Sequence, residues 1–375
     1  MDIGIPKETR LREHRVALAP SGVRTLVQRG HRVWVESDAG LAAGHPNPDY
    51  QSAGAQIAYS RHEVFARAGL VATVYAPAPE EYALLQKDQV VFGFWALPAV
   101  RPEDFRALTE REATTIGIET IEDDAGHAPV RTSMSEIAGT LAVVVGSGLL
   151  LNEFGGKGIL LGGVPGVPPA NFVVLGAGVL GRAAARAALG LGAQVTLLDV
   201  SVAHLRDATS HLPSAVTTML ATPPNVEKAL SFADLVLGAV AVREQRAPIL
   251  VTRAMLRLMK PRSVVVDLAI DMGGCFETSR PTTFTSPTYE VDGILHMCIP
   301  NLPSGAARTA TQALTNAILP YLQAVADEGL DAALRARPDL ARGTYVYRGR
   351  CASERLARSF GVEWWRLPLS EEQRR

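Results

Sequence analysis

Short apolar runs alternate with amphipathic stretches along the first 125 or so residues. The strand-like runs occupy residues 3–6, 31–35, 69–74, 89–96 and 115–118. Stretches such as 20–29 and 48–53 lie between them and carry apolar residues at helical spacing. This alternation is typical of βαβ units, so we expect the segment to form a small α/β domain.

A second series of strand-like runs follows a glycine-rich stretch, residues 155–169, which marks the entry to another domain. The runs are 173–175, 194–199, 216–220, 234–240, 263–267 and 294–299. Six strands predict a doubly wound, largely parallel sheet. Residues 305–328 have a helical pattern, and the tail beyond Gly343 is mixed. A chain that returns in this way usually packs on the first domain. The predicted fold class is therefore α/β, with a Rossmann-type domain inserted into a second α/β domain.

The first strand of the second series runs into a G-x-G-x-x-G turn made by Gly176, Gly178 and Gly181. The first glycine permits the tight turn, the second allows the backbone to approach a pyrophosphate, and the third packs helix on strand. The next strand ends in Asp199, which is placed to bond a ribose 2′-hydroxyl and would repel a 2′-phosphate. The pattern predicts NAD as cofactor in preference to NADP. The alternative is a glycine turn in a core that binds nothing.

The composition of the chain indicates which classes of binding partner to expect. The chain has 375 residues, a hydrophobic fraction of 47%, 20% charged residues and a net charge of -1, with Lys and Arg scattered. Nothing in this pattern indicates nucleic acid or an anionic membrane as a partner, so small molecules are expected. The N-terminus lacks the layout of a secretion signal, and the apolar run 138–151 is too short to span a bilayer, which favours a buried helix. Cys275, Cys298 and Cys351 have no metal-ligand spacing. We expect reduced core thiols, no metal site and a cytoplasmic protein.

Several long motifs, in order along nearly the whole chain, resemble the alanine dehydrogenase family. Its relatives include the NAD-binding subunit of proton-pumping transhydrogenase. The motifs are Gly4-Ile-Pro-Lys-Glu-Thr9, Arg15-Val-Ala17, Met134-Ser-Glu-Ile-Ala-Gly139, Gly162-Gly-Val-Pro-Gly166, the glycine turn at 176–181, residues 267–283, Asn301 and Ala313-Leu-Thr-Asn-Ala317.

The resemblance implies that residues 1–128 and 307–375 form a substrate domain and that residues 129–306 form the NAD domain. Arg15 matches the residue that clamps the substrate carboxylate, although a surface ion pair is the alternative. Asp271 matches a catalytic aspartate, with an N-cap or turn residue as the alternative. Asn301 is expected to contact both the substrate and the cofactor. By the same resemblance the cofactor is lined by Ser135, Gly176, Gly178, Val179, Gly181, Asp199, Val240, Ala241, Leu268, Ala269, Ile270, Asp271, Arg280, Ile299, Asn301 and Leu302.

Two departures from the family pattern fall on the chemistry. Where alanine dehydrogenases carry Lys-Val-Lys-Glu-Pro this chain has residues 73–77, Thr-Val-Tyr-Ala-Pro, so Tyr75 replaces the substrate-binding lysine. Where they carry Phe-Leu-His-Leu this chain has residues 94–97, Phe-Trp-Ala-Leu, so Ala96 replaces the catalytic histidine. A methyl group cannot exchange protons. Tyr75 is a candidate donor, while Trp95 and Tyr75 add aromatic surface and Ala96 with Gly93 adds room. Near the adenine, His204 and Ala221 replace a lysine and a serine.

Three interpretations remain open from the sequence. The protein is an NAD-dependent dehydrogenase of a bulkier 2-amino acid or imine, with His14 and His296 as further proton-transfer candidates. Alternatively, it is an ordinary alanine dehydrogenase in which water or neighbours replace the missing groups. In the third interpretation it binds NAD without hydride turnover, as a sensor, partner subunit or lyase. The resemblance implies a homo-oligomer, a dimer or hexamer, acting on an amino acid or 2-oxo acid.

Overall fold

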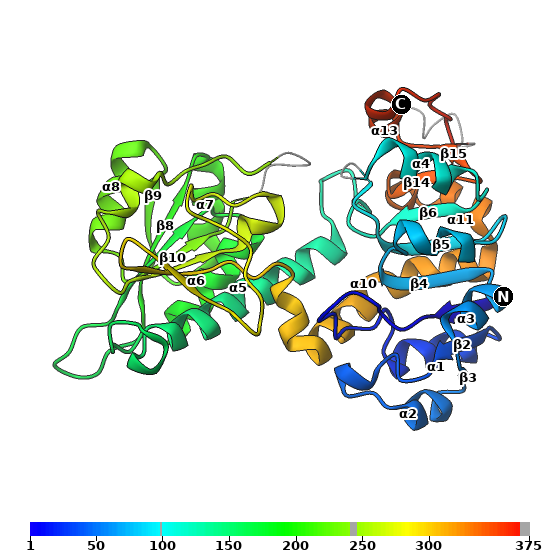
Figure 1. Cartoon of the computed structure of the whole chain (residues 1–375), viewed down its shortest axis with the longest axis horizontal. Helices are drawn as coiled ribbons and strands as arrows, with labels where there is room; N and C mark the ends of the chain where they lie inside the picture. The colour runs from blue at the N-terminus through cyan, green and yellow to red at the C-terminus, as the bar shows by residue number, and fades with distance from the viewer. Residues whose placement is uncertain (98–99, 241–245, 368–375) are drawn as a thin grey trace. The chain divides into compact units, whose positions relative to one another are not determined.

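The computed structural model describes residues 1–97, 100–240 and 246–367 (Figure 1). The chain forms two compact units. Unit 1 comprises residues 1–134 and 304–375, and unit 2 comprises residues 135–303. The second unit is thus an insertion in the sequence of the first. The assignment of substrate to one part and NAD to the other, with boundaries at 128 and 306, stays a prediction.

Unit 1 is built on an eight-stranded sheet in the order β15-β14-β6-β5-β4-β1-β2-β3. Strands β1 to β6 pair in parallel, and β14 and β15 add an antiparallel edge beside β6 (Figure 1). The five predicted runs all form strands of this sheet. The strands are β1 (Asp2–Ile5), β2 (Arg32–Glu36), β3 (Gln56–Ala58), β4 (Leu70–Tyr75), β5 (Val90–Phe94), β6 (Thr114–Gly117), β14 (Thr344–Tyr347) and β15 (Arg350–Cys351).

Helices cover both faces of this sheet. They are α1 (Pro20–Gln28), α2 (Asn47–Ser52), α3 (Arg61–Arg67), α4 (Pro102–Thr109), α10 (Ala307–Glu328), α11 (Leu330–Ala336), α12 (Pro338–Arg342) and α13 (Glu354–Phe360). Helix α10 buries Ala310, Leu314, Ile318 and Leu322 at intervals of four, the spacing of one helix face. Its Thr311 and Thr315 hydroxyls accept hydrogen bonds from Val16 N and Ala19 N at 3.1 and 2.8 Å. These bonds hold the segment that follows Arg15.

Unit 2 is built on a seven-stranded sheet in the order β12-β13-β11-β10-β7-β8-β9. Its six parallel strands confirm the predicted doubly wound sheet, and the antiparallel edge strand β12 was not predicted. Alternate residues of β7 face opposite layers. Val174 packs with α5 (Pro129–Leu149), α6 (Val179–Gly190) and α7 (Val202–His211), and Val173 packs with α8 (Pro223–Phe232) and α9 (Arg253–Leu256). The strands are β7 (Asn171–Leu175), β8 (Gln194–Asp199), β9 (Thr217–Leu220), β10 (Leu235–Gly238), β11 (Val264–Asp267), β12 (Tyr289–Val291) and β13 (Ile294–Met297).

Helix α5 (Pro129–Leu149) is longer than the apolar run 138–151 suggested, so the length argument against a membrane span was wrong. The helix begins nine residues before that apolar run and has 21 residues, so among the described residues it is long and apolar enough to cross a membrane. Length and composition alone are weak evidence for a span, since a core helix passes the same test. Ala142 and Val143 are buried in the core of unit 2, whereas Val144 is 57% exposed.

A single buried carboxylate organises the loop after β11. Asp267 has no exposed surface and accepts hydrogen bonds from Ala269 N at 2.9 Å, Cys275 N at 2.8 Å and Ser279 Oγ at 2.6 Å. It is also the N-cap of the short helix η5 (Leu268–Met272), which carries Asp271. A buried charge with this many donors fixes the path of the loop.

Replacing Asp267 with Asn should therefore destabilise unit 2, because the new amide group turns N–H donors towards existing N–H and O–H donors. Hydrogen bonds to charged groups contribute about 1.5–3 kcal/mol each, so a loss of about 3 kcal/mol or more in unfolding free energy is expected. Urea titration followed by circular dichroism measures it, with the exposed Glu290→Gln variant as control. Equal midpoints for the two variants would contradict this account.

Candidate functional site

The glycine turn of unit 2 has the shape of a phosphate cradle. Gly176 has φ +112°, and a β-carbon there would lie 2.5 Å from the carbonyl oxygen of Ala239. A β-carbon on Gly181 would lie 1.8 Å from the carbonyl oxygen of Gly176, so strand and helix can approach only without a side chain. Gly178 is the N-cap of α6, and a β-carbon there would meet nothing within 4 Å. The turn thus leaves open space at a helix N-terminus, which fits a pyrophosphate.

Asp199 at the end of β8 is tied to this turn. Its carboxylate accepts hydrogen bonds from Ala177 N at 2.7 Å and from Ser201 N at 2.8 Å, and lies 3.3 Å from Nδ1 of His204. The His204 side chain is 60% exposed. Asp199 therefore fixes the turn, and a ribose hydroxyl would share this carboxylate with His204.

Two other predicted residues meet at the carboxyl end of β11. Asp271 is exposed on η5, and Asn301 N approaches its Oδ2 at 3.5 Å. Asn301 has φ +53°, a conformation that asparagine adopts more readily than most residues. Asp267, and not Asp271, is the helix cap here.

The remaining predicted cofactor positions are distributed over the same unit. Ser135 and Val179 are half-buried on α5 and α6, and Val240 is half-buried just after β10. Leu268, Ala269 and Ile270 lie on η5, while Ile299 and Leu302 follow β13 and are buried. The Arg280 guanidinium lies 4.3 Å from the centre of the Tyr289 ring. Ala241 lies outside the described residues.

In unit 1, Arg15 forms an ion pair, but a buried one, which corrects the surface alternative. Its Nε and Nη2 bond the two carboxylate oxygens of Glu13 at 2.7 Å each, and the side chains are 2% and 1% exposed. Burial alone would lower the pKa of Arg15, but the bonds and charge of Glu13 raise it. Nη1 lies 3.4 Å from Sδ of Met134, a weak acceptor. A ligand carboxylate that replaced this sulfur contact would meet a guanidinium already held in orientation.

Tyr75 ends β4 beside two guanidinium groups. Arg10 lies 3.9 Å and Arg15 5.7 Å from the centre of its ring, and the Phe94 ring lies 5.9 Å away. The Glu8 carboxylate accepts hydrogen bonds from Val74 N at 2.7 Å and Tyr75 N at 3.2 Å. Burial raises the pKa of Glu8 to about 7, against the lowering effect of these two bonds.

Ala96 lies just beyond the end of β5, where it is exposed and has φ +47°. Trp95 corrects one expectation, because its side chain is 3% exposed and its Nε1 donates to the carbonyl oxygen of Val91 at 3.3 Å. It packs in the core instead of adding aromatic surface. Gly93 adds no room either, since a β-carbon there would lie 2.4 Å from Oγ1 of Thr73.

The two histidine candidates have different environments. His296 is fully buried, with Nε2 2.8 Å from Oγ1 of Thr278 and Nδ1 3.0 Å from the carbonyl oxygen of Ile294. Burial lowers its pKa. It therefore belongs to the packing of unit 2. His14 is exposed, and its backbone N donates to Oγ of Ser304.

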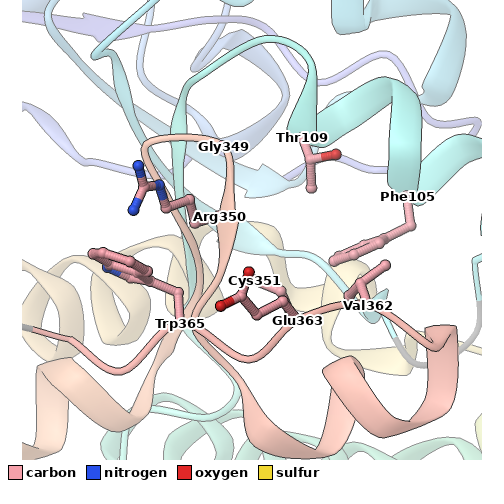
Figure 2. Close-up of a pocket in the computed structure, with 8 residues that line it drawn as sticks. All are labelled: Phe105, Thr109, Gly349, Arg350, Cys351, Val362, Glu363 and Trp365. Atoms are coloured by element: carbon pink, nitrogen blue, oxygen red, sulfur yellow. The ribbon is translucent and has the colours of Figure 1, made fainter.

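Sequence reasoning missed three acidic residues that bond to Arg15 or to the backbone around Tyr75 and Ala96: Glu8, Glu13 and Glu119. Glu8 stands within the first quoted motif, and Glu13 two residues before Arg15, so proximity to quoted residues was the available signal. Glu119 had none. A pocket of about 360 Å³ lies elsewhere in unit 1 and contains none of the predicted site residues. Figure 2 shows its lining, which is Phe105, Thr109, Gly349, Arg350, Cys351, Val362, Glu363 and Trp365.

Comparison with known proteins agrees with these observations. The model of the family described as alanine dehydrogenase/PNT, N-terminal domain, matches residues 4–138, and that of its C-terminal domain matches residues 142–354. The alanine dehydrogenase of Halomonas elongata is 45% identical over 364 residues, 97% of this chain and 98% of that protein. The alanine dehydrogenase of Mycobacterium tuberculosis is 43% identical over 96% of this chain and 97% of its own length.

Solved structures show the same relationship. An L-alanine dehydrogenase superposes with a TM-score of 0.92 at 44% identity, covering 96% of this chain and 99% of that one. A transhydrogenase from Sinorhizobium meliloti superposes with a TM-score of 0.81 at 26% identity, covering 95% and 100%. The predicted family and fold class are confirmed, and the predicted NAD cofactor and oxidoreductase class are those of the family. The chain belongs to the alanine dehydrogenase/PNT family.

Proposed function

We propose that this protein is an NAD-dependent dehydrogenase of a 2-amino acid larger than alanine. The observation that carries the proposal is the pair of side chains at the carboxyl ends of β4 and β5. A tyrosine flanked by two guanidinium groups and an exposed methyl group stand where the family pattern has a lysine and a histidine. The smaller side chain at position 96 leaves space beside Tyr75 and Phe94 for a longer substrate side chain.

The residues of unit 2 fit a dinucleotide. The open glycine turn would receive the pyrophosphate and Asp199 the ribose, and bound NAD would supply the hydride acceptor. Asp271 and Asn301 would lie near the reacting carbon, as the family resemblance implies. The proposal also assigns the remaining cofactor contacts, which are Ser135, Val179, Val240, Ala241, Leu268 to Asp271, Arg280 and Ile299 to Leu302.

The residues of unit 1 would bind and orient the acid. Arg15, held by Glu13, would bond the substrate carboxylate, and Tyr75 would donate a hydrogen bond to the amine or oxo end. In the oxidative direction the α-carbon loses a hydride, the nitrogen loses a proton, and water then converts the imine to a 2-oxo acid and ammonia. Water beside Ala96 would accept and donate the protons that the histidine of the family pattern exchanges in alanine dehydrogenases. We further expect a cytoplasmic homo-oligomer.

The test is direct. Purified protein is mixed with NAD and a panel of L-amino acids, and separately with NADH, 2-oxo acids and ammonia, while the nicotinamide absorbance is recorded. Turnover of longer substrates faster than alanine or pyruvate supports the proposal. Fastest turnover of alanine points to an ordinary alanine dehydrogenase. No absorbance change with any pair, together with NAD binding by calorimetry, points to a homologue without hydride turnover.

Asp199 should set the preference for NAD. Replacement by Asn keeps the side-chain shape but removes the charge, and one charge-assisted bond is worth about 1.5–3 kcal/mol, so the NAD dissociation constant should rise about tenfold or more. The penalty against NADP should shrink. Calorimetric titration measures both, and thermal unfolding checks that the glycine turn survives. An unaltered NAD affinity would remove Asp199 from the cofactor site.

Restoring the family side chains should restore the family chemistry. The double variant Tyr75→Lys with Ala96→His should gain pyruvate-dependent NADH oxidation, because acid–base help contributes about 10²–10⁴-fold. Histidine tolerates the left-handed backbone at position 96 comparatively well. Because Trp95 is turned into the core, it should not obstruct the imidazole. Efficient pyruvate turnover by the unmodified protein would refute the argument.

Glu8 should give the protein a distinctive pH dependence of stability. Its pKa is raised from 4.5 to about 7 on folding, so its favourable contribution is complete below pH 4.5 and is lost as the pH rises through 7. The variant Glu8→Gln cannot ionise and should lose this dependence, gaining on the unmodified protein by up to about 1.4 kcal/mol per pH unit in that window. Urea unfolding between pH 5 and 8 measures the difference. An exposed-site control, Glu80→Gln, should run parallel to the unmodified protein, and parallel behaviour of Glu8→Gln would contradict the burial argument.

A further inference from the structure

We infer that Glu119 is a positioning residue, which holds the backbone of Trp95 and Ala96 in the shape that the substrate site requires. The inference rests on the proposed function for the role of that site, but its geometry lies wholly within unit 1. Glu119 follows β6, the neighbour of β5 in the sheet.

One oxygen of Glu119 gathers three donors. Oε1 accepts hydrogen bonds from Ala96 N at 2.9 Å, Trp95 N at 3.2 Å and the Tyr345 hydroxyl at 3.2 Å. Within the part of the chain that the structure describes, Oε2 is buried and has no hydrogen-bond partner. Burial raises the pKa of Glu119, and the three bonds oppose this by favouring the ionised form. Such a side chain is costly to bury, and its bonds to Trp95 N and Ala96 N offset part of that cost.

The backbone that Glu119 holds is strained. Ala96 has φ +47°, a left-handed conformation that is unfavourable for a residue with a β-carbon. Two successive N–H groups turned to one carboxylate oxygen offset that cost. The buried indole of Trp95 anchors the other side of the segment. Without the carboxylate, relaxation of Ala96 to negative φ would move the segment beside Tyr75 and Phe94.

Tyr345 connects this arrangement to the C-terminal hairpin. It lies on β14, and its ring packs so closely on Gly117 that a β-carbon there would lie 2.2 Å from Cε2. The ring therefore fixes where its hydroxyl meets Glu119. Glu8 does for the end of β4 what Glu119 does for the end of β5, since each carboxylate holds two successive backbone N–H groups.

The first measurement needs no substrate. Trp34, Trp364 and Trp365 are replaced by Phe, which leaves Trp95 as the one tryptophan of the chain. The quenching of its fluorescence by acrylamide is then recorded. In this background Glu119→Ala should raise the quenching constant severalfold, whereas Glu119→Gln, which keeps a carbonyl acceptor, should stay within about twofold. Tyr345→Phe removes one donor and keeps both backbone bonds, so it is the mild variant should Glu119→Ala fold poorly.

The second measurement separates positioning from general stability. With the best substrate of the panel, Glu119→Ala should raise KM about tenfold, while the NAD dissociation constant stays within twofold. Adding Ala96→Gly to Glu119→Ala should reduce the rise in KM, because glycine adopts positive φ without help from the carboxylate. The KM of the double variant should approach that of Ala96→Gly alone.

The outcomes are distinguishable from those of the proposed function. If no pair in the panel is turned over, the proposed function fails, and the quenching experiment still decides the role of Glu119. Unchanged quenching in a folded Glu119→Ala protein overturns the inference. So does equal damage by Glu119→Gln and Glu119→Ala, or a parallel loss of NAD affinity.

Discussion

Buried or half-buried carboxylates that accept backbone hydrogen bonds shape the carboxyl ends of the strands in both units. Parallel strands end in loops whose N–H groups have no ladder partner, and a buried N–H without an acceptor is costly. Glu8 serves this need for β4 and Glu119 for the segment after β5. Asp199 accepts N–H groups of the loops after β7 and β8, and Asp267 accepts N–H groups of the loop after β11. The fold thereby places acidic groups at the strand ends where ligands of open α/β sheets bind.

This constraint explains how side chains at a site can change while its backbone does not. At positions 75 and 96 the carboxylates hold the main chain, which is the same for any residue type except proline. A change of side chain at either position would therefore leave this backbone arrangement in place. The proposed function needs such a change without a change of fold, and the TM-score of 0.92 to the L-alanine dehydrogenase shows that the fold is shared.

Much of the fold was predictable because buried parallel strands are continuous apolar runs separated by glycine-rich or helical segments. The missed strands are β3, β12, β14 and β15, which have two to four residues and lie at or beside sheet edges. Short edge strands bury little apolar surface, so their sequences carry a weak pattern. The start of α5 was missed because polar residues of its first turns hide the helical period.

The candidate site was predictable where a motif specifies geometry, as at the glycine turn. It was not predictable where partners are distant in sequence. The contact between Glu119 and Tyr345 joins residues 226 apart, and an acid that bonds backbone N–H groups leaves no spacing signature. The burial of Trp95 and the crowding around Gly93 are likewise properties of packing, which residue types alone do not reveal.

The split of unit 1 into two chain segments sets the order in which the protein can be completed during synthesis. Unit 2 is continuous, so its sheet has all its strands once residue 303 has left the ribosome. Unit 1 at that stage lacks β14, β15 and α10, and with them Tyr345 and the threonines that hold the segment after Arg15. A nascent chain at this stage therefore carries a complete unit 2 joined to an incomplete unit 1. Unit 1 can be completed only after its last strands and helices emerge. Until then β6 lacks its neighbour β14 and is an open sheet edge, the kind of edge on which other chains can pair.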